Sequence, residues 1–185
     1  MSKQVFLVCV VVFPFMICSG IVYSILSLYF AKLGATKSQI GFIYTSGALA
    51  GAAMAPFLGR LADKWGRKVI LFMSMGLFML LFLGYALSKC CFHLFLIQIA
   101  EGIAWSAMGT SATALLADVA PVAHRGEAMG IYNTAWSIGW IIGPSLGGIS
   151  SDHLGFKLTF LICAGIMLFG IILGMRLLQK AVKDV

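Results

Sequence analysis

The chain has 185 residues, of which 61% are hydrophobic and only 10% are charged, and its mean hydropathy is +1.02. Soluble domains are about half apolar and about a quarter charged, so this composition excludes a water-soluble globular protein. It also excludes a disordered chain or a small disulfide-bonded scaffold. The 13 Lys and Arg and six Asp and Glu residues give a formal net charge of +7. These charges are too scattered to bind a nucleic acid, so the sequence predicts an integral membrane protein.

Six apolar stretches are long enough to cross a bilayer, which requires about 20 residues of helix. We expect these spans at about residues 5–30, 38–58, 69–87, 93–117, 128–150 and 158–175. The first stretch is too long for a signal peptide and has no convincing cleavage site, so it is predicted to be a helix. No linker divides the chain. The predicted fold is therefore one all-α domain over residues 1–185 with six transmembrane helices.

The positions of Lys and Arg predict the orientation of these spans. An even number of spans places both termini on one side of the membrane. If that side is the cytoplasm, nine Lys and Arg residues lie inside and four lie outside, at Lys32, Lys37, Lys89 and Lys157. The sequence thus predicts a multi-pass protein of the cell membrane, plasma or inner, with both termini in the cytoplasm.

The five cysteines give little indication of chemistry. Cys9, Cys18 and Cys163 lie in apolar runs, where a thiol packs as a small hydrophobic group. Cys90 and Cys91 are adjacent near the end of a span. We interpret all five as free structural thiols, with a redox or metal role for the adjacent pair as the alternative. No other ligand cluster is visible, so neither a metal nor a cofactor is expected.

Three loop segments carry recognisable patterns. GRLADKWGRK occupies residues 59–68, DVAPVAHRG occupies 118–126, and DHLGFK occupies 152–157. In the first segment, Gly59 and Gly66 are expected to bracket a tight turn, and the four-residue spacing of Asp63 and Arg67 fits one helical face. A purely topogenic loop with solvated charges is the alternative interpretation.

These loop patterns resemble those of the major facilitator superfamily of transporters. The first segment departs from the family signature clearly only at Lys64, where Arg is usual. The resemblance implies that Asp63, Arg67 and Asp118 form a charge network that locks one conformation of the alternating-access cycle. It also assigns to these cytoplasmic gating loops the residues Gly59, Gly66, Lys68 and Arg125.

The fifth predicted span is rich in glycine. Gly139, Gly143 and Gly147 recur every four residues, leaving a stripe along which another helix can approach closely, and Pro144 favours a kink. The full spacing resembles the antiporter motif of drug–proton exchangers, which implies export; its members here are Gly130, Gly139, Gly143, Pro144, Gly147 and Gly148. In the second span, Gly47 and Gly51 form another predicted packing pair.

Glu101 is the one charged residue, with His counted as neutral, inside the six predicted spans. A carboxylate at mid-bilayer costs roughly 2.5 to 3.5 kcal/mol, so we expect Glu101 to face a cavity or a partner and to bind and release a proton during transport. Gln98 and Trp105 continue the same helical face. The alternative is a neutral Glu held by Gln98 for packing alone.

The same span departs from the family pattern. Many drug exporters resemble R-x-x-q-G here, whereas this chain has QIAEG at residues 98–102 and lacks the Arg. Coupling therefore cannot be assigned to that Arg and would fall to Glu101, either by itself or together with groups outside this chain. Such a site suits cationic or neutral lipophilic substrates, in a pocket that we expect to be lined by Tyr23, Tyr44, Trp105, Tyr132 and Trp136.

The resemblance covers essentially the whole chain and implies the N-terminal half of a transporter. Such transporters have two six-helix halves, each a pair of inverted three-helix repeats. The expected partners are a small-molecule substrate, protons, the lipid bilayer and a second six-helix half, with a central cytoplasmic loop expected to start after residues 179–185. No hydrolase, metalloprotease or nucleotide-binding motif occurs, so an enzyme is not expected.

The leading interpretation is half of a twelve-helix, proton-coupled exporter. Three alternatives stay open. The chain could act as a homodimer, as a truncated or regulatory subunit without transport activity, or as part of an uptake carrier for sugar or another metabolite.

Overall fold

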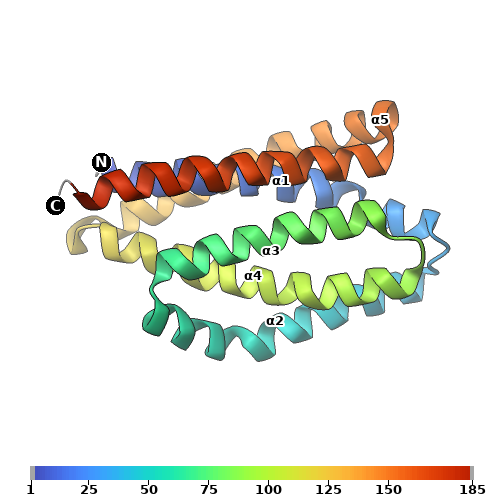
Figure 1. Cartoon of the computed structure of the whole chain (residues 1–185), viewed down its shortest axis with the longest axis horizontal. Coiled ribbons are helices and arrows are strands. Elements are labelled where there is room, and N and C mark those ends of the chain that lie inside the picture. The colour runs from blue at the N-terminus through green and yellow to red at the C-terminus, as the bar shows by residue number, and fades with distance from the viewer. Residues whose placement is uncertain (1–2, 184–185) are drawn as a thin grey trace.

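A computed structural model describes the backbone of residues 3–183 and the side chains of residues 4–177. Its elements are α1 (Lys3–Lys32), α2 (Lys37–Trp65), α3 (Arg67–Leu87), α4 (Cys91–Val119), the short 3-10 helix η1 (Val122–His124) and α5 (Arg125–Lys183). The long helices lie side by side, and the two termini lie at the same end of the bundle (Figure 1). Lys3, Lys180 and Lys183 are three of the nine Lys and Arg residues predicted to lie on the cytoplasmic side. Their side chains are outside the described residues.

All five long helices are long and apolar enough to span a membrane. The count differs from the six predicted spans because α5 contains both 128–150 and 158–175. Only Gly155 is non-helical between them, with φ 77° and ψ 162°, a conformation that is essentially restricted to glycine. The two arms of α5 fold back on each other, and the reversal lies at the end of the bundle opposite the two termini (Figure 1).

The helices also extend past the apolar stretches that predicted them. α2 continues to Trp65, so the prediction that Gly59 brackets a turn is wrong; Gly59 lies inside the helix. Gly66 alone makes the α2–α3 turn, with φ 97°. Asp63 and Arg67 consequently lie on two different helices and do not share one helical face. The physical reason is that apolar composition marks the hydrocarbon core, whereas helical hydrogen bonding continues into the polar region beyond it.

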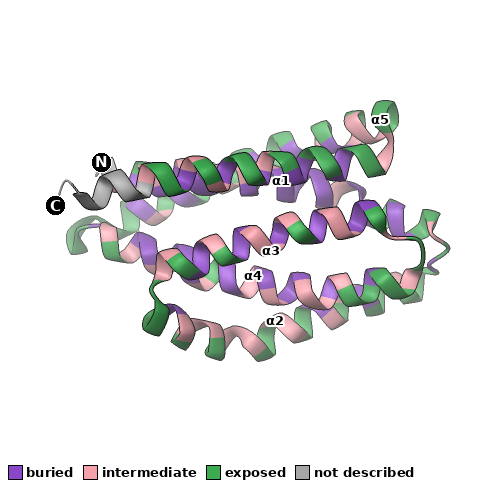
Figure 2. Ribbon diagram, in the orientation of Figure 1, coloured by how far each residue is buried: buried purple, intermediate pink, exposed green. Residues whose placement is uncertain are grey.

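The interior is built around α1. This helix packs mainly against α5, α2 packs mainly against α4, and α3 contacts both α4 and α5. α2 is the least covered of the five, with mostly exposed and intermediate residues along its length (Figure 2). Aromatic side chains fill the centre, where the fully buried rings include Phe15, Phe30, Phe78, Phe82, Tyr85 and Phe160.

Glycine stripes permit close contacts in two pairs of helices, α1 with α5 and α2 with α4. A Cβ added to Gly143 would lie 2.6 Å from the Cα of Gly20 on α1, and one added to Gly139 would lie 2.8 Å from the backbone of Met16. On α2, a Cβ added to Gly51 would lie 2.6 Å from the carbonyl oxygen of Gly102 on α4. These distances are shorter than ordinary van der Waals contact, so the predicted close packing at both stripes is confirmed.

Candidate functional site

The candidate site centres on Glu101, which lies inside the helix bundle with only 1% of its surface exposed. Tyr85 on α3 is hydrogen-bonded through its hydroxyl to Glu101 Oε2. The same hydroxyl donates to Gln98 Oε1 across 2.9 Å. None of the ion pairs among the described residues includes Glu101. The carboxyl group is therefore held by the neutral hydroxyl of Tyr85, and no described side chain forms an ion pair with it that would balance a negative charge.

Local sequence explains how these three side chains meet. Gln98 and Glu101 are three residues apart on α4 and so lie on one helical face. The connection between α3 and α4 is short, with α3 ending at Leu87 and α4 beginning at Cys91. The two helices are therefore antiparallel neighbours, and Tyr85, close to the end of α3, reaches the face of α4 that carries the Gln and the Glu.

Tyr85 is not among the site residues predicted from the sequence. One signal could have indicated it: a tyrosine inside an otherwise apolar span has a hydroxyl that must find a partner when buried. The helix periodicity places Tyr85 on the face of α3 that points into the bundle, and the structure shows that its side chain is fully buried. Which partner it finds depends on the packing of α3 against α4.

Trp105 continues the Glu101 face of α4, as predicted, and lies among aromatic rings. Its ring centroid is 5.2 Å from that of Phe15, 5.5 Å from that of Phe78 and 5.9 Å from that of Tyr23. The geometries are edge-on, which is a favourable arrangement for aromatic pairs. Trp105 is thus fixed in position between the buried core and the surface of the α2–α4 pair.

A pocket of about 440 Å³ lies beside this cluster. Helices α1, α2 and α4 form its walls, and the side chains of Tyr23, Tyr44, Gln98 and Trp105 are among those that line it. Glu101 is not part of the wall. Gln98 therefore stands between the buried carboxyl group and the pocket, since it contacts Tyr85 on one side and lines the pocket on the other.

Of the five aromatic residues expected to line a pocket, Tyr23, Tyr44 and Trp105 line this one, whereas Tyr132 and Trp136 do not. These two residues of α5 stack on each other with ring centroids 6.4 Å apart and pack with the core. Sequence spacing could not make this distinction, because it depends on which helix covers the site.

Two polar atoms next to the pocket lack partners. Trp105 Nε1 and Ser106 Oγ are buried without a hydrogen bond to any described residue, and both residues line the pocket. A buried donor without a partner is costly, so an acceptor from water or from a bound molecule would stabilise these groups. The pocket combines aromatic walls with a few polar groups, which is typical of small-molecule sites.

A second cluster of charges lies where α2, α3 and α4 meet at one end of the bundle. Arg67 Nη1 pairs with Asp118 Oδ1 and donates to the carbonyl oxygen of Ala114 across 2.7 Å. Arg67 Nη2 lies 3.5 Å from Asp63 Oδ1. The structure thus brings together the three residues Asp63, Arg67 and Asp118. The guanidinium of Arg67 connects the start of α3 to the ends of α2 and α4.

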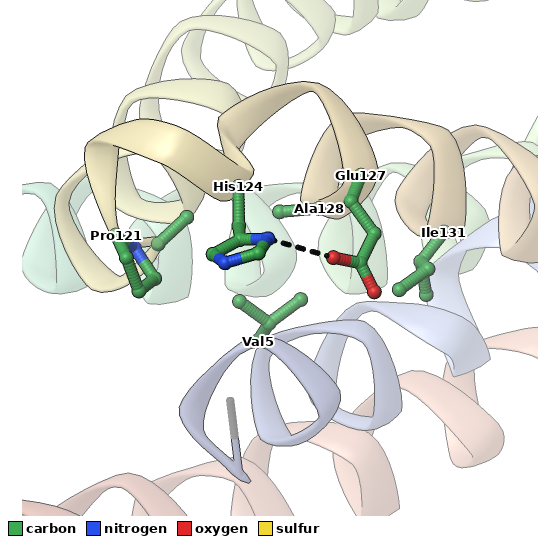
Figure 3. A pocket seen from close by; sticks show the side chains of 7 residues that line it. Val5, Pro121, His124, Glu127, Ala128 and Ile131 are labelled. Atoms are coloured by element: carbon green, nitrogen blue, oxygen red, sulfur yellow. Dashed lines mark ion pairs between the residues drawn. The ribbon is translucent and has the colours of Figure 1, made fainter. Parts of the chain in front are cut away.

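The remaining loop residues do not join this network. Lys68 and Arg125 form no ion pair among the described side chains. His124 instead pairs with Glu127, with 3.2 Å between His124 Nδ1 and Glu127 Oε2. This pair lines a separate cavity of about 300 Å³ between the α4–α5 connection and Val5 of α1 (Figure 3).

The glycine motif of α5 divides into two sets. Gly139, Gly143 and Gly147 are buried against α1, whereas a Cβ added to Gly130 or Gly148 would meet nothing within 4 Å. Pro144 lies inside α5 without a break in the helical backbone at that position. Close packing against α1 explains why Gly139, Gly143 and Gly147 are glycines. No packing contact within the described residues explains Gly130 and Gly148.

The cysteines are distributed as the sequence suggested. Cys9, Cys18 and Cys163 are buried, and Cys90 is exposed. The thiol of Cys91 donates to the carbonyl oxygen of Leu33 across 3.3 Å. No group of three or more His, Cys, Asp or Glu side chains gathers within the described part of the chain in a way that could hold a metal ion.

The all-helical fold, the apolar spans and the pocket beside a buried carboxyl group define a multi-pass membrane protein of the transporter type. The chain matches the Major Facilitator Superfamily over residues 8–184 and belongs to that family. It is 30% identical over 182 residues to an uncharacterized MFS-type transporter, MJ1560, of Methanocaldococcus jannaschii, covering 98% of this chain and 47% of that protein. It is 27% identical over 184 residues to the quinolone resistance protein NorA of Staphylococcus aureus, covering 100% of this chain and 47% of NorA. The chain therefore spans about half the length of the curated relatives it matches.

Proposed function

We propose that the chain is the N-terminal half of a twelve-helix secondary transporter, which exports a small lipophilic or cationic solute in exchange for protons by alternating access. The observation that carries this proposal is the buried Glu101, joined through Tyr85 to Gln98 at the wall of a pocket. An acid inside the membrane is expensive and is typical of proton-coupled transporters. A proton is the ligand that such an uncompensated carboxyl group can bind and release.

Six membrane crossings with cytoplasmic termini are part of the proposal. Both termini lie at the end of the bundle that also holds the α2–α3 connection (Figure 1). The ends of α2 and α3 that flank this connection carry Arg60, Lys64, Arg67 and Lys68, and this excess of positive charge favours the cytoplasmic side. The reversal of α5 at Gly155 supplies the sixth crossing. We place the protein in the plasma or inner membrane.

Two inverted three-helix repeats are supported by the pairing of helices. The first helix packs on the fifth span and the second helix packs on the fourth. Exchanging the two sets of three helices converts each of these pairs into the other, as an inverted repeat requires. The two connections before the third and sixth spans are also alike: each has Asp, two residues and then a glycine with positive φ, at Gly66 and Gly155.

A second six-helix half is supported by length and by the exposed surface. The relatives are about twice as long as this chain. The α2 helix is poorly covered, and large apolar side chains such as Phe42, Leu49 and Phe57 are exposed along it. In the proposed full-length transporter, the other half covers part of this surface and completes the substrate site at the membrane midplane.

The proposed direction of transport is export. NorA is named for quinolone resistance, and the spacing of glycines on α5 resembles the antiporter motif. In this proposal the Asp63–Arg67–Asp118 cluster acts as the cytoplasmic gate. Because Arg67 ties three helices together at that end, breaking its contacts is required before the helices can separate.

The test is gradient-driven efflux from membrane vesicles that contain the native polypeptide. Glu101→Gln removes the ionisable group and keeps the size of the side chain, so we expect efflux to be lost while membrane insertion is retained. Glu127→Gln is the matched control, because it makes the same change at an exposed residue paired with His124. Unchanged efflux with Glu101→Gln would show that the acid is structural and would favour a regulatory subunit without transport activity.

The size of the native polypeptide tests the half-transporter part of the proposal. An antibody against residues near the N-terminus should detect a denaturation-resistant species of about twice 19.9 kDa or more in the source membranes. A species of 19.9 kDa would contradict this part and would favour pairing with a separate subunit or with a second copy. Crosslinking in the membrane separates these two cases.

A further inference from the structure

We propose that Tyr85 couples the protonation state of Glu101 to the pocket. It does so by determining whether the oxygen or the nitrogen of the Gln98 amide faces the pocket. Protons and a cationic substrate then compete although the substrate never touches Glu101. This inference rests on the proposed proton-coupled function and names Tyr85 as a positioning residue and Gln98 as the group that contacts the substrate. It also selects lipophilic cations from the broader substrate class given above.

The hydroxyl of Tyr85 carries a single hydrogen and has two neighbouring acceptors. The hydroxyl lies within hydrogen-bonding distance of two oxygen atoms, Gln98 Oε1 and Glu101 Oε2. It has one hydrogen and can donate to only one of them, whereas it can accept from a second donor. The observed contacts are fully satisfied when Tyr85 donates to Gln98 Oε1 and the protonated Glu101 donates to Tyr85.

Loss of the proton reverses the order of these hydrogen bonds. An ionised Glu101 only accepts, so Tyr85 must turn its hydrogen towards the carboxylate. The carbonyl of Gln98 then has no donor from Tyr85. When the amide turns over, Nε2 donates to the Tyr85 oxygen, so the carboxylate, the hydroxyl and the amide nitrogen each keep a partner, and Oε1 is left for a donor from the pocket. One proton leaves Glu101 for the aqueous phase in this change, and one returns in the reverse change.

The structure shows why the turned amide matters to the pocket. Gln98 Oε1 faces Tyr85, and Nε2 faces α2, 3.3 Å from the position of a Cβ added to Gly47. Gly47 also lines the pocket. The protonated state therefore presents amide N–H donors on this side, which disfavour a cation. The ionised state presents the amide carbonyl oxygen, which attracts one.

Other ionisable groups do not provide a competing explanation. The side chains that face Glu101 from the packed helices are Tyr23 of α1, Tyr44 of α2 and Tyr85 of α3. Tyrosine in ordinary surroundings titrates near pH 10, well above the physiological range. Within the described part of the chain no Lys, Arg or His pairs with Glu101. We therefore assign the pH dependence of this cluster to Glu101.

The experiment measures binding of ethidium, a planar lipophilic cation, to the purified native polypeptide at about pH 6 and about pH 8. Infrared difference spectra follow the carboxylic acid band of Glu101, assigned by its loss in Glu101→Gln. We expect the wild type to bind ethidium at least about 5-fold more tightly at the higher pH, a typical coupling between sites. Tyr85→Phe should bind equally at both pH values while the Glu101 band still titrates. A structural role alone would weaken binding at both pH values by the same factor.

Two further variants make the result decisive. Tyr132→Phe removes a hydroxyl from another buried tyrosine that does not line the pocket, so it should keep the wild-type ratio. Gln98→Met removes the amide at similar length and should abolish the ratio even if Tyr85→Phe fails to insert. A wild-type ratio in Gln98→Met or in a folded Tyr85→Phe protein overturns the proposal, as does a wild type whose ethidium binding is the same at both pH values.

Failure of this proposal is distinguishable from failure of the proposed function. Proton-driven efflux that depends on Glu101, together with binding whose pH dependence survives in Tyr85→Phe, overturns the amide mechanism and leaves proton-coupled transport in place. An intact binding ratio that depends on Tyr85, without any proton-driven efflux, overturns the transport function alone.

Discussion

The glycine stripe of α5 gives a prediction that separates helix packing from any other role of the motif. Gly143→Ala places a methyl group 2.6 Å from the Cα of Gly20 and 2.9 Å from the backbone nitrogen of Ile21. Both atoms belong to the α1 backbone, which cannot move without shifting the whole helix. Gly148→Ala, five residues along the same helix, meets nothing within 4 Å.

The expected size of the effect follows from this geometry. Overpacking a well-filled interface costs about 1 to 3 kcal/mol. Replacing Gly by Ala also favours the helix by up to about 1 kcal/mol, and this contribution is common to both variants. The difference between Gly143→Ala and Gly148→Ala should therefore be about 1 to 3 kcal/mol, which corresponds to roughly 5-fold to 140-fold in the unfolding equilibrium.

The assay is reversible unfolding of the purified native polypeptide in lipid bicelles, with both variants measured alongside the wild type. We expect Gly148→Ala to be as stable as the wild type or slightly more stable. Equal losses of stability in the two variants, or no loss with Gly143→Ala, would refute the packing argument. A loss of transport in a fully stable Gly148→Ala protein would assign that glycine a role beyond the contacts of this half.

Three other predictions follow from the loops. Asp118→Asn removes one of the two carboxylates that pair with Arg67 and weakens the contacts that must break at this end. Opening of the cytoplasmic end should therefore become several-fold faster while the affinity for substrate stays within about twofold, as measured by transport kinetics and equilibrium binding. Gly66→Ala forces a side chain into a positive-φ turn and should lower the free energy of unfolding by about 1 to 2 kcal/mol. Gly59→Ala is the control: its methyl group lies in open space on a helix, so the free energy of unfolding should stay the same or rise. A membrane-impermeant maleimide should label the exposed Cys90 from outside intact cells, and labelling only in inverted vesicles would reverse the proposed orientation.

The sequence alone was sufficient to predict the class of protein. Hydrophobic content, stretches of about 20 apolar residues and the loop motifs identified a helical membrane protein of this superfamily, because these signals depend on local composition and spacing. The periodic glycines also predicted close helix contacts correctly. Local signals failed at helix ends, as at Gly59, because the limits of the apolar core do not mark where helical hydrogen bonding stops.

Only the tertiary structure decided how the site is assembled. The sequence placed Gln98 and Glu101 on one face, but the packing of α3 on α4 brought Tyr85 to both of them. It also separated Glu101 from the pocket wall and removed Tyr132 from it. These relations join residues on different helices, so they depend on crossing angles and rotations that no single segment of sequence encodes. The buried acid could be predicted from its residue type, whereas its hydrogen-bond partners are a property of the fold.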